Sequence, residues 1–160
     1  MKIKLFVTGG IINKEYDTKN KNLYFSSKPI FNIINQVNYT SYLSIETLFM
    51  KEPCDINKQD IKLIIKSCKS SNFNKILINF TIKEKEKEKT ILLLDKLNSI
   101  ENHQTIILFD STIPYQFENS DASFILGVVV GAISYLEKGV YIFKNGKIVN
   151  SLDMEKSSFI

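Results

Sequence analysis

The chain has 160 residues, of which 44% are hydrophobic and 24% charged, which is the size and composition of a single soluble globular domain. Its formal net charge of +4 comes from lysine alone, because the sequence contains no arginine. Arginine supplies the planar guanidinium that clamps phosphates and guanine edges, so its absence argues against a nucleic-acid partner.

Membrane, export and metal-binding signals are also missing from the sequence. No apolar run approaches the ~20 residues that cross a bilayer, and the first apolar stretch is too short for a secretory signal. Cys54 and Cys68 lie far apart without a CxxC spacing, so we expect buried or incidental thiols rather than a metal or redox pair. We therefore expect a cytoplasmic protein with no membrane partner, no metal and no cofactor.

Strand-like apolar runs alternate with longer periodic stretches that are typical of helices. Strands are expected at about 3–8, 43–49, 75–80, 105–109 and 139–143, and helices at about 29–38, 57–70, 84–98 and 121–136. This alternation predicts an α/β fold in which crossover helices connect the strands of a mainly parallel sheet. No repeat or linker divides the sequence, so residues 1–160 are expected to form one domain.

Caps and turns indicate where some of these elements begin and end. Asn57, with Asp60 in the first turn, is a plausible N-cap of the second helix, and Asp121 is expected to cap the last one. Asn145-Gly146 is a typical hairpin turn, so residues 139–149 predict a terminal β-hairpin.

Two glycines lie four residues apart in the last expected helix. Gly127 and Gly131 share one helix face, and we expect them to let this helix approach the sheet or a partner helix closely rather than to form a membrane dimer motif. The apolar stretch 124–136 is expected to contribute either to the core or to a contact between subunits.

The end of the first strand carries the most informative motif. The apolar run closes with Thr8-Gly9-Gly10 and continues with Ile11, as a strand running into a tight turn at the edge of a sheet. Loops at such strand ends carry the chemistry of α/β folds. The layout resembles the first motif of the asparaginase family, threonine-glycine-glycine-threonine-isoleucine, in which the second threonine is the nucleophile. In this chain that position is Ile11.

The resemblance extends over nearly the whole chain. The matching pieces follow in the family's order: Thr105-Ile106-Ile107-Leu108, Ile113-Pro114-Tyr115, Ser120-Asp121-Ala122, and Gly139-Val140-Tyr141-Ile142 with Asn145-Gly146. The sequence resembles short, single-domain asparaginase-like proteins, which correspond to the amino-terminal domain of full-length asparaginases. This resemblance implies a three-layer sandwich ending in a β-hairpin, a homo-oligomer, and a small amide or amino-acid ligand.

The family's chemistry is mostly missing at the corresponding positions. The resemblance places Ile82 and Lys83 where the family has its second threonine and its aspartate, and Pro53 where a serine grips the substrate carboxylate. Only Tyr16 and Lys156 fall near a catalytic tyrosine and lysine, as remnant candidates. A hydrocarbon at the nucleophile position cannot attack an amide, and catalytic residues that act as a unit fail together. No catalytic set is therefore intact.

Several of these residues allow two interpretations. Thr8 is either a strand-end residue that bonds the turn or a substitute nucleophile, and Tyr16 is either an exposed loop aromatic or a lid remnant. Lys156 is either a retained catalytic lysine or one of many surface lysines. Polar residues at the expected strand ends form the ligand-binding candidates: Thr8, Gly9, Gly10, Thr81, Asp110, Ser111 and Thr112.

Two functions follow from this pattern. The favoured one is a catalytically degenerate asparaginase-like domain that acts as a binding or assembly protein. The alternative is an active amidohydrolase whose nucleophile has moved to another hydroxyl, such as Thr8, Thr81, Ser111 or Thr112. A nucleotide-binding module would need a longer glycine-rich phosphate loop than Gly9-Gly10 provides.

Overall fold

The sheet at the centre of the molecule is mainly parallel. The computed structural model describes residues 1–37, 39, 41–100 and 103–154, and within them six strands form one sheet in the order β4-β1-β5-β6-β7-β8. Neighbouring strands are parallel except for β7 and β8, which pair antiparallel. The strands are β1 (Lys2–Val7), β4 (Tyr42–Thr47), β5 (Lys75–Asn79), β6 (Thr105–Phe109), β7 (Gly139–Lys144) and β8 (Lys147–Asn150). The predicted α/β class and mainly parallel sheet are confirmed.

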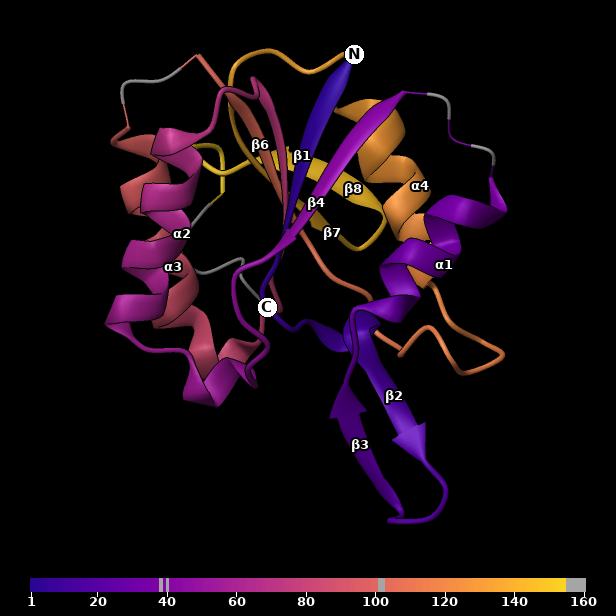
Figure 1. Ribbon diagram of the computed structural model, residues 1–160. Helices are drawn as coiled ribbons and strands as arrows, with labels where there is room; N and C mark the ends of the chain where they lie inside the picture. The colour runs from indigo at the N-terminus through magenta and orange to yellow at the C-terminus, as the bar shows by residue number, and fades with distance from the viewer. Residues whose placement is uncertain (38, 40, 101–102, 155–160) are drawn as a thin grey trace.

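Helices cover both faces of this sheet, which makes three layers. Helices α1 (Lys28–Gln36) and α4 (Ala122–Ala132) lie on one face, and α2 (Lys58–Ser70) and α3 (Lys87–Asn98) lie on the other (Figure 1). The period of two along a strand sends alternate side chains to opposite faces. In β5, for example, Leu77 belongs to the core under α1 and α4, while its neighbours Ile76 and Ile78 belong to the core under α2 and α3. All residues of β6 are buried, as expected for a strand covered on both faces.

The terminal hairpin and the cap of α2 are as predicted. Asn145 and Gly146 both have positive φ (49° and 76°), as a tight two-residue turn between β7 and β8 requires. The side chain of Asn57 accepts the backbone N–H groups of Gln59 and Asp60, and the Asp60 carboxylate accepts the Asn57 N–H in return.

Two predicted helix starts differ from the structure. Residues 84–86 form the short 3-10 helix η3 (Glu84–Glu86), and the α-helix begins only at Lys87. Asp121 precedes α4 without capping it, because its carboxylate instead accepts the N–H groups of Thr112 and Ile113. The sequence could not reveal this competition, since Thr112 is brought to Asp121 by the loop between β6 and α4.

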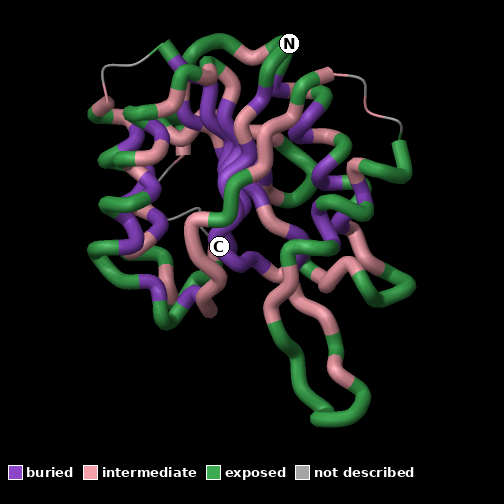
Figure 2. The backbone as a smooth tube through the Cα atoms, viewed as in Figure 1, coloured by how far each residue is buried: buried purple, intermediate pink, exposed green. Residues whose placement is uncertain are grey.

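A second hairpin, which the sequence analysis did not predict, projects from the body of the molecule. Strands β2 (Lys14–Asp17) and β3 (Asn22–Phe25) pair antiparallel with each other and extend away from the main sheet (Figure 1). Much of the hairpin is exposed, so its residues lack the alternation of polar and apolar types that marks a half-buried strand (Figure 2). The Asp17 carboxylate accepts the N–H groups of Lys19 and Asn20 and so closes the turn.

Gly127 and Gly131 do not let α4 approach the sheet closely, which was one of the two kinds of packing expected of them. Both are exposed on α4, and a Cβ atom at either position would meet no atom within 4 Å. A glycine inside a helix costs about 0.5–1 kcal/mol relative to alanine, so this chain bears that cost twice without a reason in its own packing.

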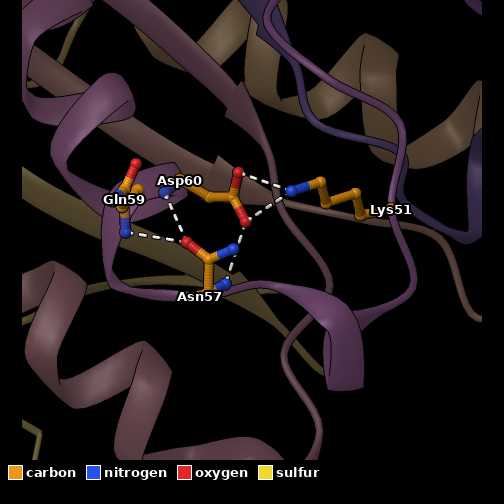
Figure 3. A network of polar contacts seen from close by, with 4 residues as sticks. All are labelled: Lys51, Asn57, Gln59 and Asp60. Carbon is orange, nitrogen blue, oxygen red and sulfur yellow. Dashed lines mark hydrogen bonds and ion pairs between the residues drawn. The ribbon is translucent and has the colours of Figure 1, made fainter.

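A lysine–aspartate pair holds the loop after β4 against the start of α2. The Lys51 ammonium donates to both carboxylate oxygens of Asp60, at 2.8 and 2.9 Å, beside the capping box of Asn57 (Figure 3). Burial alone would raise the pKa of the Asp60 carboxyl, but the hydrogen bonds from Lys51 and Asn57 and the lysine charge keep it below the ordinary value. The pair also fixes the backbone of Lys51, whose N–H donates to the carbonyl oxygen of Thr8.

We expect Asp60→Asn to lower the free energy of unfolding by about 1–2 kcal/mol at neutral pH, because it breaks both the capping box and the ion pair. The folded pKa of Asp60 is depressed, so its contribution is complete above the unfolded value of 3.8 and is lost as the pH falls through the folded value. Urea unfolding of both proteins at neutral and acidic pH measures this difference. The exposed Asp95→Asn is the control, and a gap between wild type and Asp60→Asn that persists unchanged in acid would contradict the prediction.

Candidate functional site

The turn after β1 lies beside the carboxyl ends of the parallel strands β5 and β6. In the sheet, β1 pairs with β4 on one side and with β5 on the other, and β6 is the next strand after β5. Gly9 has a φ of 91°, and a Cβ atom there would lie 2.5 Å from the backbone nitrogen of Lys51. A Cβ atom at Gly10 would lie 2.4 Å from the side chains of both Asn79 and Asp110. Close approach of neighbouring atoms therefore requires glycine at both positions, and the positive φ is a second reason at Gly9.

Asp110, the first residue after β6, is the centre of the polar contacts at this turn. Its carboxylate accepts the backbone N–H groups of Ile11 at 2.7 Å, Ile12 at 3.1 Å and Ser111 at 2.9 Å. It also accepts the side-chain amide of Asn79 at 3.1 Å and the hydroxyl of Thr81. Five donors from three segments of the chain thus converge on one carboxylate.

The pKa of Asp110 reflects two opposing effects. Withdrawal from water raises the pKa of its carboxyl above the ordinary value, while the hydrogen bonds from Thr81, Ile11, Ile12 and Ser111 act in the opposite direction. Removal from water is the larger effect. The hydrogen bonds therefore offset part of the free-energy cost of burying a charged carboxylate at this position.

Asn79 and Thr8 link the strand ends beneath this carboxylate. The Thr8 hydroxyl donates to the carbonyl oxygen of Asn79 at 2.5 Å, and the Asn79 side-chain oxygen accepts the Gly10 N–H at 3.1 Å. Thr8 and Asn79 are both buried. The Thr8 hydroxyl is thus engaged with the backbone of β5 and does not line the cavity beside the turn.

A cavity of about 430 Å³ opens beside this turn. Its apolar wall consists of Ile11, Phe80, Ile82, Phe124, Ile125 and Phe143. Its polar wall consists of Thr81, Lys83, Asp110, Ser111, Thr112, Asp121, Lys144, Asn145 and Gly146. The cavity is large enough for a small organic molecule and mixes apolar surface with a few polar groups, as ligand sites usually do.

Two hydroxyls of the polar wall differ in their partners. The Thr112 hydroxyl donates to Asp121 at 2.8 Å, whereas the Ser111 hydroxyl is buried without a hydrogen-bond partner among the described residues. Burial would raise the pKa of Asp121, but the hydrogen bonds from Thr112 and Ile113 hold it below the ordinary value. Asp121 therefore closes the loop after β6 as a charged group.

The structure brings together only part of the candidate set. Thr81, Asp110, Ser111 and Thr112 line the cavity with Ile11, whereas the other candidates from the first motif, Thr8, Gly9 and Gly10, lie outside its lining. Tyr16 is on the β2–β3 hairpin, with 39% of its surface exposed, and lies outside the lining. Lys156 lies outside the described residues.

Three contributors were missed by the sequence analysis. Asn79 was assigned only to a strand, Asp121 only to a helix cap, and Asn145 only to a turn. Asn79 ends β5 and Asn145 follows β7, and a polar residue at the carboxyl end of a parallel strand is a signal for a site, whereas Asp121 directly precedes α4. Among the described residues, no three His, Cys, Asp or Glu side chains lie close enough to hold a metal ion. None of the helices described is both long and apolar enough to cross a membrane.

Comparison with known proteins identifies solved structures that share this fold. No protein-family model and no curated protein sequence matches the chain. The thermostable L-asparaginase from Thermococcus kodakarensis superposes with a TM-score of 0.75 at 19% identity, over 94% of this chain and 46% of that one. A probable cytoplasmic L-asparaginase from Campylobacter jejuni gives a TM-score of 0.74 at 16% identity, over 93% of this chain and 47% of the other.

A third structure, L-asparaginase I from Vibrio cholerae, gives a TM-score of 0.70 at 14% identity, over 93% of this chain and 46% of that one. The chain therefore has an asparaginase-like fold, and it spans about half the length of these solved structures.

We expect Asp110→Ala to lower the free energy of unfolding by at least about 3 kcal/mol, because each buried donor left without an acceptor costs ~1–3 kcal/mol. The matched control is Ser111→Ala, which removes a hydroxyl without a partner and should change stability by less than about 0.5 kcal/mol. Chemical denaturation of both variants measures the difference. Equal stability of the two variants would show that Asp110 does not hold the strand ends together.

Proposed function

We propose that this chain is a pseudoenzyme: a binding domain with an asparaginase-like fold that does not hydrolyse amides. The observation that carries the proposal is the occupation of the β1 turn by Asp110. Its carboxylate accepts the N–H groups of Ile11 and Ile12, so neither donor is available to a substrate carbonyl. Amide hydrolysis needs such donors where negative charge develops on the carbonyl oxygen.

The side chains around the turn support the same proposal. Ile11 presents an aliphatic surface to the cavity where a nucleophile would stand, and Ile82 adds a second one. Lys83 also lines the cavity, at the place where the family resemblance calls for an aspartate. An attacking hydroxyl needs a base and a third group that orients the base, and the aliphatic side chains of Ile11 and Ile82 can supply neither.

The composition of the cavity lining favours a ligand that is itself partly apolar. Its walls include two isoleucines that the resemblance aligns with threonines, and the aromatic rings of Phe124 and Phe143. Within the proposed class of small amides and amino acids, we expect side chains such as leucine or phenylalanine to bind better than asparagine. The proposal includes a cytoplasmic location, which suits two cysteines that are both free thiols.

We expect the purified chain to release no ammonia from asparagine or glutamine above background, where an ordinary enzyme would turn over at ~1 s⁻¹ or faster. A coupled ammonia assay with an authentic L-asparaginase as the positive control tests this. Turnover at enzyme-like rates that Ile11→Trp abolishes would overturn the proposal.

Binding is tested separately by ligand-observed NMR with leucine, phenylalanine, asparagine and glutamine. We expect the apolar amino acids to bind and Ile11→Trp, which fills the cavity, to abolish binding. Leu63→Trp, on the exposed face of α2, is the matched control and should leave binding unchanged. No binding to the wild type by any of the four would contradict the assignment of this ligand class.

A second candidate function rests on the contact between Thr81 and Asp110. The Thr81 hydroxyl donates to a carboxylate whose pKa is raised by removal from water, which is the arrangement of a nucleophile beside its base. In this alternative the chain is an amidohydrolase that uses Thr81. If a screen of amide substrates detects hydrolysis, Thr81→Val should abolish it, while Thr112→Val, the other cavity threonine, should not.

A further inference from the structure

A groove lined by lysines opens where α2 and α3 meet. The two helices lie side by side on one face of the sheet (Figure 1). The groove has a volume of about 460 Å³, which is within the range of small-ligand sites. Four lysines, one isoleucine and one serine line it: Lys62, Ile65, Lys66, Lys69, Ser70 and Lys96. None of these residues lines the cavity beside the β1 turn, so the groove is a separate feature.

The four lysines of this groove have no acidic partner. No Asp or Glu is among the described residues that line the groove, and none of the four ammonium groups forms an ion pair within the described part of the chain. Elsewhere the protein does neutralise such groups, as in the pair of Lys51 and Asp60. Asp95 is next to Lys96 in sequence but lines a different hollow, beside the segment after β8. The groove therefore presents four positive charges to whatever enters it.

Three of these lysines form a stripe along α2. Lys62, Lys66 and Lys69 are spaced four and three residues apart, which sets them on one helix face over about 10 Å of its length. Like charges at these spacings repel each other and destabilise a helix. Lys69 and Lys96 lie in the last turns of α2 and α3, where a positive charge also favours the helix dipole, but Lys62 and Lys66 precede that turn. A bound anion would relieve the repulsion along the stripe.

We propose that this groove binds a compact oligophosphate, a chain of two or three linked phosphate groups. A terminal phosphate carries about 1.5–2 negative charges at neutral pH, so such a chain matches four ammonium groups within a small volume. Carboxylates carry one charge each, and a larger molecule would be needed to supply as many. Lysine suits a phosphate chain because its ammonium group is a compact point charge with three donors that can rotate.

The rest of the lining favours recognition of the phosphates alone. No aromatic residue is among the described residues of the groove, so it offers no ring on which a nucleobase could stack. Besides the lysines, the lining has one apolar side chain, Ile65, and one hydroxyl, on Ser70. We therefore expect a free oligophosphate and the phosphate chain of a nucleotide to bind with similar affinity, since the base adds no contact.

Isothermal titration calorimetry of the full chain with sodium tripolyphosphate, in low salt and without divalent cations, tests the proposal. We expect a dissociation constant below about 1 mM, which rises at least about tenfold in ~300 mM salt because salt screens exposed charges. Changing Lys62→Gln and Lys66→Gln together should weaken binding at least about tenfold. Glutamine and lysine have similar helix propensities, so this double variant keeps its fold, which circular dichroism verifies.

The matched control removes the same net charge from the same helical layer. Lys58→Gln and Lys87→Gln, made together, change exposed lysines of α2 and α3 that do not line the groove, and tripolyphosphate binding should stay unchanged. Equal weakening in the two double variants would mean that net charge alone attracts the ligand, and it would overturn the proposal. Absence of binding to the wild type at about 10 mM tripolyphosphate in low salt would overturn it as well.

Two further ligands test the chemical class and the source of the phosphates. Citrate, a compact carboxylate anion, should bind at least about tenfold more weakly than tripolyphosphate, and ATP should bind within about threefold of it. Citrate binding as tight as that of tripolyphosphate would contradict phosphate recognition. ATP binding that is tenfold tighter or more, on the order of 1.4 kcal/mol, would place the base in the site and contradict recognition of the phosphates alone.

Discussion

The acceptance of five hydrogen bonds by the Asp110 carboxylate is the constraint on which the end of the sheet depends. Three parallel strands end here, and each leaves polar backbone groups that must find partners once they are removed from water. A single carboxylate at the end of β6 accepts N–H groups from the turn after β1 and side-chain donors from the end of β5. The close approach of Gly10 to Asn79 and Asp110 is possible only because glycine has no Cβ atom. The turn can take this shape only with glycine at position 10, and its N–H groups are satisfied only if residue 110 can accept them.

The same interaction is the basis of the proposed function. An asparaginase-like sheet brings the β1 turn and the ends of β5 and β6 together, and in this chain the Asp110 carboxyl group accepts the hydrogen bonds of that turn. Around it the wall of the cavity is partly aliphatic, from Ile11 and Ile82. The cavity beside the turn has a volume of about 430 Å³, which is enough for a small ligand. Two contacts in the cavity lining still place a hydroxyl next to a carboxylate: Thr81 with Asp110, and Thr112 with Asp121.

Away from the cavity, the two helical layers differ in charge: α2 and α3 carry many charged residues, whereas Lys28 is the one charged residue in α1 and α4. Lysines and acids on α2 and α3 keep that side in water, whereas α4 presents glycines and aromatic rings. Phe124 belongs both to α4 and to the wall of the cavity.

The sequence by itself determined the alternation of strands and helices, the Asn57 cap and the Asn145-Gly146 hairpin turn, because these depend on periodicity and on residues close along the chain. It also marked Ile11 and the strand-end candidates Thr81 and Asp110. Only the tertiary structure decided that Asp110 accepts hydrogen bonds from residues about 100 positions away, that Asp121 serves the loop after β6 instead of α4, and that Gly127 and Gly131 face open space. These outcomes depend on which groups meet across the sheet. Local sequence propensity cannot predict these contacts, because the partners are distant in sequence and become neighbours only after folding.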